Sequence, residues 1–382
     1  MLFFLNTIFI VMAVCLLIGS LLPLMDYPHW FIRAWDFPRV QIVILIWSTA
    51  VGYWLTNLAF LGALDARAAV FGGVAVIVTV WHLSQIAPYT SWTEPQVKAW
   101  DPQLSGPSAD DSRLRLVMTN VLQENRQIEL WKDVLRRADP DVMIVAELNA
   151  DWAAALNDLR STYPYQIHQP QENCYGMAIA SRLPITEQAV RFLVQEDIPS
   201  IDTLVQLPSG EHVRIVGVHP RPPEPIRDTY STARDGELAL WGKELASETR
   251  PVVIGGDLND VAWSRSTRLF LRVSQLLDPR RGRGFYNSFH ARHWWMRFPL
   301  DHVFHSDHFS LRRLARLGPV GSDHFPILVD LQFEPREQDD HEQLDKKHGD
   351  SEEATEKIER AEESPVAQSD IETPSEGPNA SP

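Results

Sequence analysis

The chain places eight polar residues at or near the ends of short apolar segments: Asn120, Glu147, His219, Asp257, Asn259, Asp301, Asp323 and His324. Strand ends are positions from which a rigid element holds a side chain in a site. Singly, each residue also fits a turn, a helix cap or a structural role. Together, carboxylates can hold a divalent cation and activate water, amides can donate to a phosphate oxygen, and a histidine can transfer a proton. Hydrolysis of a phosphate ester needs this mixture, because the ester is anionic and repels an attacking nucleophile.

Alternating strand and helix patterns position these residues. Residues 114–121 and 142–146 are predicted as buried strands, and between them apolar residues recur at helical spacing over residues 128–138. Asp139-Pro140 ends that helix. The β-α-β unit carries the first two polar residues of the set at its strand ends, and the fold class is α/β (α+β). Further strands are expected at 176–180, 213–218, 251–255, 303–305 and 327–333, and a further helix at 232–247.

Short motifs surround these residues. They are, in chain order, Thr-Asn-Val, Ala-Glu-Leu, Gly-Met-Ala-Ile-Ala-Ser-Arg, Val-His-Pro, Gly-Asp-Leu-Asn, Leu-Asp-His-Val and Ser-Asp-His-Phe-Pro. Over about residues 112–333 the series resembles the endonuclease/exonuclease/phosphatase (DNase I-like) superfamily, and Gly-Asp-Leu-Asn and Ser-Asp-His-Phe-Pro are its most specific pieces. The resemblance implies a DNase I-like four-layer sandwich of two mixed sheets flanked by helices, with the site at one end. It also implies attack of water on a phosphate ester assisted by Mg²⁺, with Mn²⁺ as the alternative ion.

The resemblance assigns three residues to the metal. Glu147 resembles the main metal ligand, and Asn120 resembles the residue that helps to hold metal or phosphate. Asp323 resembles a second carboxylate on the metal side. Tyr175 is a candidate for a tyrosine that some branches of the superfamily use.

The resemblance assigns catalytic roles to the other five residues. Asp257 resembles the carboxylate that orients and activates the attacking water, and Asn259 the amide that donates to the phosphorane oxygens. His324 resembles the phosphate-binding imidazole, and Asp301 the acid that orients it. His219 resembles the second histidine, which can protonate the leaving oxygen. No acid that would orient His219 can be placed from the sequence.

Three apolar runs precede this domain. No formal charge occurs before Asp26, between Arg39 and Asp65, or between Arg67 and Glu94. A helix that crosses a bilayer needs about 20 mainly apolar residues, and helices of soluble cores normally keep one polar face. We therefore expect three transmembrane helices. Their position ahead of the domain resembles a bacterial membrane-anchored branch of the superfamily.

The flanking charges and the first apolar run bear on the orientation of the chain in the membrane. The first run has no Lys or Arg before its apolar stretch and no A-x-A cleavage site, so we expect a retained span. Three spans make a multi-pass integral protein of a bacterial inner or plasma membrane, with the N-terminus and the domain on opposite sides. Arg33, Arg39 and Lys98 fall on the domain side and Arg67 on the other, which leans toward a cytoplasmic domain. A difference of three against one leaves the side open.

The expected organisation is three transmembrane helices at 1–90, a linker at 91–111, the catalytic domain at 112–335 and a tail at 336–382. The formal net charge is −15, and the tail contributes −10 of it, with 15 acids against 5 bases. A segment so rich in Glu, Asp, Ser and Pro cannot bury enough surface to offset its ordering entropy. We expect a disordered acidic tail, in which a helix at 350–363 would be marginal.

An arginine-rich segment lies beside the expected site. Residues 261–320 contain eleven Arg, no Lys and three acids, a local net charge of +8. Arginine suits bidentate recognition of phosphate. The expected substrate-binding residues are Arg292, Arg297, Trp294 and Trp295.

Three interpretations of this segment compete. The arginines could follow a nucleic-acid backbone. Alternatively, Trp294, Trp295, Met296 and Phe298 could enter the bilayer surface while the arginines meet lipid phosphate. In the third interpretation the aromatic residues pack on the domain's own core. Tethering by three spans favours a membrane-proximal substrate, since DNA gives little reason for three spans.

We therefore expect a metal-dependent hydrolase of phosphate ester bonds, namely a membrane-anchored Mg²⁺-dependent phosphoesterase whose substrate is lipid-linked or membrane-proximal. The first alternative is a membrane-tethered endonuclease or exonuclease that acts on nucleic acid. The second is a catalytically inactive, membrane-bound binding module, although the metal carboxylate and the Asp323-His324 pair are both present. The net acidity excludes a uniformly basic nucleic-acid-coating protein, and the sequence implies no protein partner.

Overall fold

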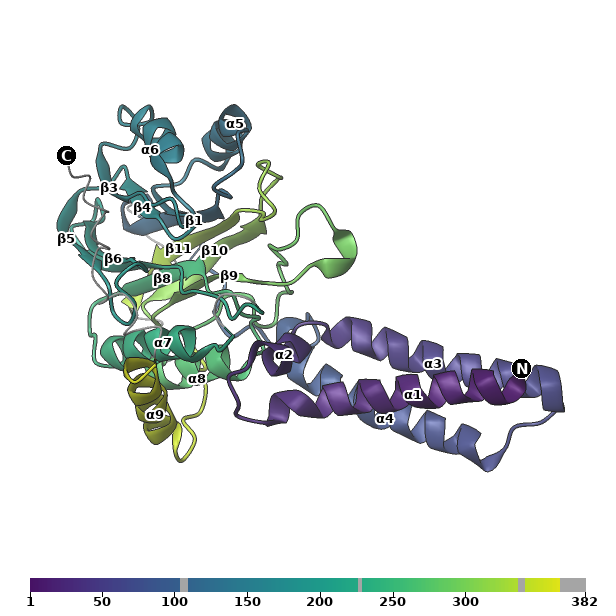
Figure 1. Ribbon diagram of the computed structural model, residues 1–382. Helices are drawn as coiled ribbons and strands as arrows, with labels where there is room; N and C mark the ends of the chain where they lie inside the picture. Colours follow the sequence, from purple (N-terminus) through teal and green to yellow (C-terminus); the bar gives the residue numbers. More distant parts are fainter. Residues whose placement is uncertain (104–108, 226–228, 336–340, 365–382) are drawn as a thin grey trace, which may run out of the picture.

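The structure, a computed structural model, describes residues 1–103, 109–225, 229–335 and 341–364. A bundle of three long helices projects from a sandwich of two β-sheets (Figure 1). The N-terminus lies at the end of the bundle that is far from the sandwich. The chain therefore runs along the bundle three times before it enters the sandwich.

The three long helices are α1 (Leu2–Leu21), α3 (Arg39–Leu61) and α4 (Ala66–Ile86). With the short turns η1 (Leu22–Leu24) and η3 (Ala87–Tyr89) they form three candidate membrane spans of 23, 23 and 24 residues. At about 1.5 Å per residue, each is longer than the ~30 Å hydrocarbon core of a bilayer. The number and place of these helices agree with the expectation from the sequence. The short helix α2 (Trp30–Arg33) and the turn η2 (Ala34–Asp36) connect α1 to α3 at the sandwich end.

The bundle buries small and aromatic side chains between its helices. Ala50 and Ala75 are fully buried, and the rings of Tyr53 and Phe71 stack with centroids 4.3 Å apart. The outer faces carry many exposed Leu, Ile and Val side chains. Such an apolar outer surface suits contact with lipid rather than with water.

The first sheet has the strand order β10-β11-β1-β2-β4-β3. β1 and β2 are parallel and the other neighbours are antiparallel, so the sheet is mixed. Its strands are β1 (Arg113–Asn120), β2 (Val142–Ala146), β3 (Tyr165–Gln169), β4 (Met177–Ser181), β10 (Phe309–Arg316) and β11 (Ile327–Phe333).

The second sheet has the order β5-β6-β7-β8-β9, with β7 and β8 parallel and the remaining pairs antiparallel. Its strands are β5 (Ile185–Arg191), β6 (Ser200–Gln206), β7 (His212–Val218), β8 (Val252–Asp257) and β9 (Asp301–His305). One apolar core lies between the two sheets. Gly217 and Gly255 keep this core thin, because a Cβ at either would press on the side chain of Ile144 in the facing sheet.

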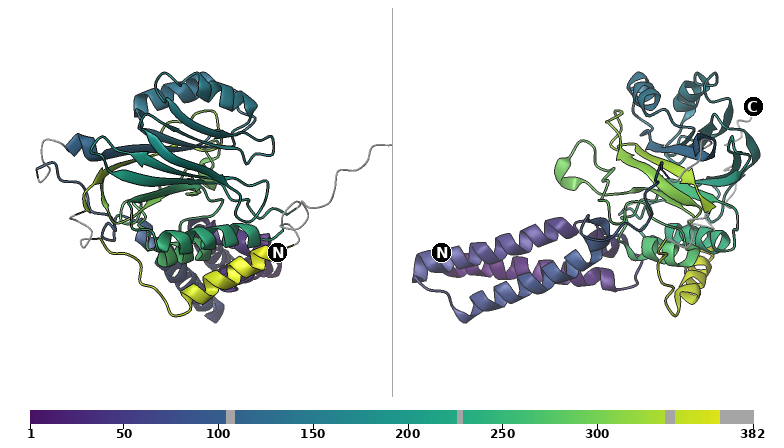
Figure 2. Two further views of the ribbon diagram at one scale, coloured as in Figure 1. Left: turned by 90° about the vertical axis from the view of Figure 1, so that its left-hand side faces the viewer. Right: turned by 180° about the vertical axis from the view of Figure 1, so that it is seen from behind.

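Helices cover the outer face of each sheet. α5 (Ile128–Ala138) and α6 (Ala150–Asn157) lie on the first sheet, and α7 (Thr232–Ala246) and α8 (Arg265–Ser274) lie on the second (Figure 2). The expected sandwich of two mixed sheets flanked by helices is confirmed.

The tail differs from the expectation. Residues 350–362 form a helix, α9 (Asp350–Glu362), which packs on α7 outside the four layers (Figure 2). Ala354 and Ala361 are fully buried in this contact. The prediction of a disordered tail is therefore wrong for residues 341–364, because an average composition ignores small residues at helical spacing and basic partners elsewhere in the chain. Residues 336–340 and 365–382 lie outside the described residues.

The segment expected as a linker packs on the domain. Val97 is fully buried and belongs to the core between the sheets. Ala99 forms a β-bridge with Leu311, and the side chain of Gln96 accepts a hydrogen bond from the backbone N–H of Asp278 at 3.0 Å. These contacts hold the start of the domain beside the end of the third span. The rest of the segment includes the turn η4 (Ala109–Ser112).

Candidate active site

The candidate site lies at one end of the sandwich, where strands of both sheets end. Asn120 is the last residue of β1 and Glu147 follows β2, while Asp257 is the last residue of β8. His219 follows β7, and Asp301 is the first residue of the antiparallel β9. The two sheets therefore contribute to one cluster from opposite sides of the core.

Backbone conformation turns two of these side chains into the site. Glu147 has φ 62° and Asn259 has φ 51°, in the left-handed region that non-glycine residues seldom adopt. Such conformations occur where the surrounding structure fixes them, often at functional sites. Both side chains are partly exposed, whereas the neighbouring Asp257 is buried.

The glycine before Asp257 is required by close packing. A Cβ at Gly256 would overlap the backbone carbonyl of Val218 on the adjacent strand β7. Only glycine permits this approach, which brings the ends of β7 and β8 together. The Gly-Gly-Asp-Leu-Asn motif thus places His219 and Asp257 side by side.

One amide joins the two sheets. Nδ2 of Asn120 donates to Oε1 of Glu147 at 2.8 Å and to Oδ2 of Asp257 at 3.1 Å. The second carboxylate oxygen of Glu147 accepts from the backbone N–H of Gln123 at 3.1 Å. Oδ1 of Asp257 accepts from the backbone N–H of Asn259 at 2.9 Å. Two carboxylates thus converge on one neutral donor.

A histidine and an aspartate form the other half of the site. Nδ1 of His324 lies 2.7 Å from Oδ2 of Asp301, and its Nε2 lies 3.5 Å from Oδ2 of Asp257. Ser288 supports this pair, because its hydroxyl oxygen accepts from the backbone N–H of Asp301 at 3.0 Å. The imidazole is therefore held with Nε2 directed at the carboxylate that ends β8.

His219 is the least anchored member of the cluster. Its Nε2 lies 3.8 Å from Oδ2 of Asp257, and its ring lies 5.3 Å from the ring of Tyr175. Among the described residues its buried Nδ1 has no hydrogen-bond partner, so no acid orients it there. Tyr175 also contacts Arg221, whose guanidinium carbon lies 5.1 Å from the centre of the tyrosine ring.

Charge and burial set the protonation of the cluster. Burial raises the pKa of Glu147 to about 7, although Asn120 and the Gln123 backbone donate to its carboxyl. Burial also raises the pKa of Asp257, and the nearby charge of His324 offsets part of this effect. Burial alone would lower the pKa of His324, but Asp301 and Asp257 raise it to about 10. Burial lowers the pKa of His219, which favours its neutral form.

Two sets of side chains in the cluster offer ligand atoms for a divalent cation, and their protonation distinguishes between them. Asp257, Asp301 and His324 each offer a ligand atom, and the three atoms lie within 4.8 Å of one another. Glu147 and Asp257 are partly or fully buried carboxylates that face one amide donor, and hard oxygen ligands of this kind suit Mg²⁺. A protonated His324 has no lone pair to give to a metal. The oxygen donors around Glu147 and Asn120 therefore fit a cation better than the histidine pair does.

The remaining expected residues lie at the edge of this cluster. Asp323 is partly exposed, and its charge contributes to the raised pKa of His324. Arg292 donates to the backbone oxygen of Gly321 at 3.1 Å, and Arg297 lies over the ring of Phe325.

The two expected tryptophans project from the domain. Trp294 and Trp295 belong to the turn η5 (Trp294–Met296) and are 78% and 56% exposed. The loop that carries η5 extends from the sandwich on the same side as the helical bundle (Figure 1). Phe298, by contrast, is buried at the junction with the bundle.

Sequence reasoning missed the residues that support the site. Gln123 supplies a backbone donor to Glu147, and its side-chain oxygen accepts from the backbone N–H of Cys174 at 2.8 Å. The hydroxyl oxygen of Ser322 accepts from the backbone N–H of His324 at 2.9 Å. The Ser-Asp-His motif contained the signal for Ser322, while nothing in the local sequence pointed to Gln123.

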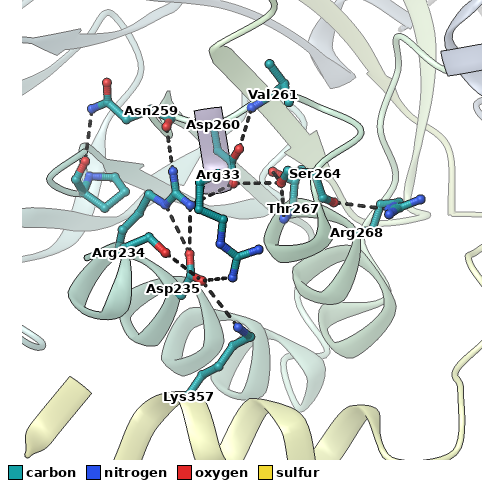
Figure 3. A network of polar contacts seen from close by, with 12 residues as sticks. Arg33, Arg234, Asp235, Asn259, Asp260, Val261, Ser264, Thr267, Arg268 and Lys357 are labelled. Carbon is teal, nitrogen blue, oxygen red and sulfur yellow. Dashed lines mark hydrogen bonds and ion pairs between the residues drawn. The ribbon is translucent and has the colours of Figure 1, made fainter. Parts of the chain in front are cut away.

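A buried ionic network packs on residues 258–264, the loop between β8 and α8, which is called the catalytic loop below (Figure 3). Arg234 on α7 donates to the backbone oxygen of Asn259 at 2.8 Å and pairs with Asp260 at 3.1 Å. Asp235 pairs with Arg234 at 3.0 Å. It also pairs with Arg33 at 3.2 Å and with Lys357 of α9 at 3.4 Å. Arg33, in the connection between α1 and α3, and Lys357, in α9, thus both pair with the carboxylate of Asp235.

Comparison with known proteins identifies a family. Residues 119–324, more than half of the chain, match the model of the Endonuclease/Exonuclease/phosphatase family. A search of curated proteins gives no significant match.

Solved structures with low sequence identity are similar to the sandwich. The human Nocturnin catalytic domain is 17% identical with a TM-score of 0.48, covering 58% of this chain and 95% of that one. A humanized D. rerio TDP2 is 15% identical with a TM-score of 0.47, covering 58% and 99%. Sphingomyelinase C from Streptomyces griseocarneus is 15% identical with a TM-score of 0.43, covering 57% and 99%.

Proposed function

Because the chain belongs to the Endonuclease/Exonuclease/phosphatase family, whose members cleave phosphoester bonds, we propose that it is a membrane-anchored, metal-dependent phosphoesterase. Its substrate in this proposal is a lipid-linked or membrane-proximal phosphate ester. The protein is then a multi-pass component of a bacterial inner or plasma membrane, with α1, α3 and α4 as its spans.

In the proposed reaction Asp257 accepts the proton of the attacking water. Its Oδ1 is fixed by the Asn259 backbone, so its Oδ2 faces the site. The Asn259 side chain donates one N–H to the carbonyl of Pro220 at 3.1 Å, which leaves its second N–H for a phosphate oxygen. His324, kept cationic by Asp301, binds another phosphate oxygen. The proton that Asp257 takes from the water passes to His219, whose Nε2 lies 3.8 Å from Oδ2 of Asp257, and from His219 to the leaving oxygen.

Glu147 and Asn120 would hold the divalent cation, with Asp323 on the outer side. A bound Mg²⁺ would supply positive charge that polarises the phosphate. The raised pKa of Glu147 supports this assignment, because a carboxylate short of positive charge gains most from a cation.

The observation that carries the membrane-proximal part of the proposal is the direct contact between the catalytic loop and the spans. Nε1 of Trp263 donates to the backbone oxygen of Asp36 at 2.7 Å. The hydroxyl of Tyr89, at the end of the third span, donates to the backbone oxygen of Ala262 at 2.7 Å. Trp263 and Ala262 lie a few residues after Asp257, so the loop that follows Asp257 packs on the sandwich end of the bundle, which supports a membrane-proximal site.

The pairing of the arginines favours lipid over nucleic acid. Arg272 pairs with Asp350 and Arg265 pairs with Glu353, each at 2.8 Å, so acids of α9 neutralise part of the basic segment. Arg280 is buried against Asp278 at 2.7 Å. A continuous basic track for a nucleic-acid backbone is therefore interrupted.

The test uses protein in lipid nanodiscs with Mg²⁺, and Asp257→Asn as the matched inactive variant. The substrates are supercoiled plasmid, soluble bis-para-nitrophenyl phosphate and a phospholipid in vesicles. We expect the wild type, but not Asp257→Asn, to hydrolyse bis-para-nitrophenyl phosphate and the phospholipid. Nicking of plasmid by the wild type but not by the variant, without lipid turnover, would replace the proposal by a nuclease. No turnover of any substrate would indicate the inactive binding module.

A further inference from the structure

A large apolar cavity lies between the first turns of α3 and the catalytic loop. Its volume is about 700 Å³, within the range of small-molecule sites. Apolar side chains form most of its wall, among them Phe37, Pro222, Met296, Phe298 and Leu300. A cavity this size and this apolar is suited to hydrocarbon rather than to a polar ligand.

One side of the cavity is continuous with the lipid face of the bundle. Ile44 and Leu45 of α3 line it and are 59% and 45% exposed on the face that a bilayer would cover. The opposite wall is the loop with η5, which is fixed to α3 because Gln41 donates to the backbone oxygen of Trp295 at 2.9 Å. A lipid chain could therefore enter sideways, between the span and the loop.

The other end of the cavity reaches the catalytic loop. Asn259, whose backbone N–H holds Asp257, lines the cavity. Pro222 and Pro223, which follow His219 in the chain, line it as well. Of the groups assigned to phosphate hydrolysis, Asn259 is the one in the cavity wall, so a molecule with its chain in the cavity has its polar end beside this residue.

From this continuity we infer that the cavity binds one hydrocarbon chain of a membrane lipid whose phosphate ester is the substrate. The inference rests on the proposed function and specifies its substrate class. A lipid must rise from the bilayer for its phosphate to reach Asp257, and exposing the methylenes of its chain to water would be unfavourable. A chain that moves from the bilayer into the cavity stays away from water throughout.

The cavity can be filled without changing a catalytic residue. Ala34 lines the cavity and is exposed, so Ala34→Trp places an indole in this space. Val40→Trp is the matched control, because Val40 is exposed at the start of α3, six residues further along the same membrane-proximal segment, and is not part of the cavity wall. Both variants add the same side chain near the membrane surface.

Direct occupancy is measured by photolabelling in nanodiscs of phosphatidylglycerol that carries a diazirine near the end of one acyl chain. We expect label on Met296 and Leu300, since Leu300 is only 5% exposed and is reached by a chain from the cavity. Ala34→Trp should lose most of this label and Val40→Trp should keep it. Label confined to the outer faces of the spans, or equal label on Leu300 in both variants, would overturn the inference.

Turnover separates this inference from the proposed function. Ala34→Trp should lower kcat/KM for a long-chain phospholipid by on the order of a hundredfold, the effect of exposing about four methylenes. It should leave hydrolysis of bis-para-nitrophenyl phosphate unchanged. If kcat/KM of Ala34→Trp falls equally for both substrates, or does not fall for the lipid, the cavity does not bind the chain of the substrate. The proposed phosphoesterase function is unaffected by either result. If the wild type hydrolyses neither ester, the proposed function fails, and the photolabelling still decides whether the cavity holds a chain.

Discussion

The contact between α7 and α9 depends on a glycine that has no room for a side chain. A methyl group at Gly236 would overlap the Cβ of Ala361 and would lie 3.1 Å from the backbone oxygen of Lys357. Gly236→Ala should therefore force α9 away from α7. Ala361→Gly, made in the same protein, removes the overlapping methyl and should restore the contact.

The magnitudes follow from packing and helix propensity. Overpacking of this kind costs about 1–3 kcal/mol, so Gly236→Ala should speed opening of α9 by roughly 5- to 150-fold. Ala361→Gly alone costs about 1 kcal/mol through lower helix propensity and about 0.8 kcal/mol through loss of a buried methyl group. Together these should speed opening of α9 roughly 20-fold. In the double variant the contact is restored and only the loss of helix propensity remains, so α9 should open roughly 5-fold faster than in the wild type.

The assay is amide hydrogen exchange of residues 350–362 in nanodisc-embedded protein, which reports local opening of the helix. The double variant should exchange more slowly than either single variant. Gly318→Ala is the control, because a Cβ there meets nothing within 4 Å. Additive losses in the double variant would refute the packing of α9 on α7, and so would wild-type exchange rates as fast as those of an unfolded peptide.

Three further predictions concern the site and its membrane contact. Trp294→Ala combined with Trp295→Ala should lower turnover of a vesicle-borne ester by about tenfold or more, through lost interfacial burial, and should spare a soluble ester; equal losses on both would contradict it. Mg²⁺ should raise the Tm of the wild type by mass action and should not raise that of Glu147→Gln, and an equal rise in both would remove Glu147 from the metal site. Asp301→Asn should lower the pKa of His324 from about 10, as followed by imidazole NMR, because the carboxylate that contributes most against the effect of burial is lost. The folded-state pKa is raised, so this contribution to stability is full below about pH 6.5 and is lost as pH rises through about 10. In Asp301→Asn the alkaline loss of stability should be smaller and should end at lower pH, and an unchanged alkaline loss would contradict the pairing.

The strands that carry the site were predictable, because they are short, apolar and followed by turn residues. β2 and β11 match their predicted ranges, and β1, β7 and β8 differ from theirs by one or two residues at either end. Other elements gave weaker local patterns. β5 is an edge strand with largely exposed, mixed polar residues, and α6 is a short helix with several alanines. Their structure depends on neighbours that a local pattern does not contain.

The candidate site residues were identifiable from type and context, but their arrangement was not. Asn120, Glu147 and Asp257 are joined through one amide, although the first and the last are 137 residues apart. The sequence did not place an acid that would orient His219, and among the described residues its Nδ1 has no hydrogen-bond partner. Asp323 remains a proposed metal-side carboxylate at the edge of the cluster.

The sequence by itself determined the three apolar spans, the α/β pattern and the set of polar residues at strand ends, because each is a local property of composition or spacing. The tertiary structure decided which charges meet. It paired arginines of the basic segment with acids of a tail that composition alone described as disordered. It also set the catalytic loop on the ends of the spans and left an apolar cavity between them. These features arise from contacts between residues 78 to 227 positions apart in the chain, and such contacts depend on packing rather than on local pattern.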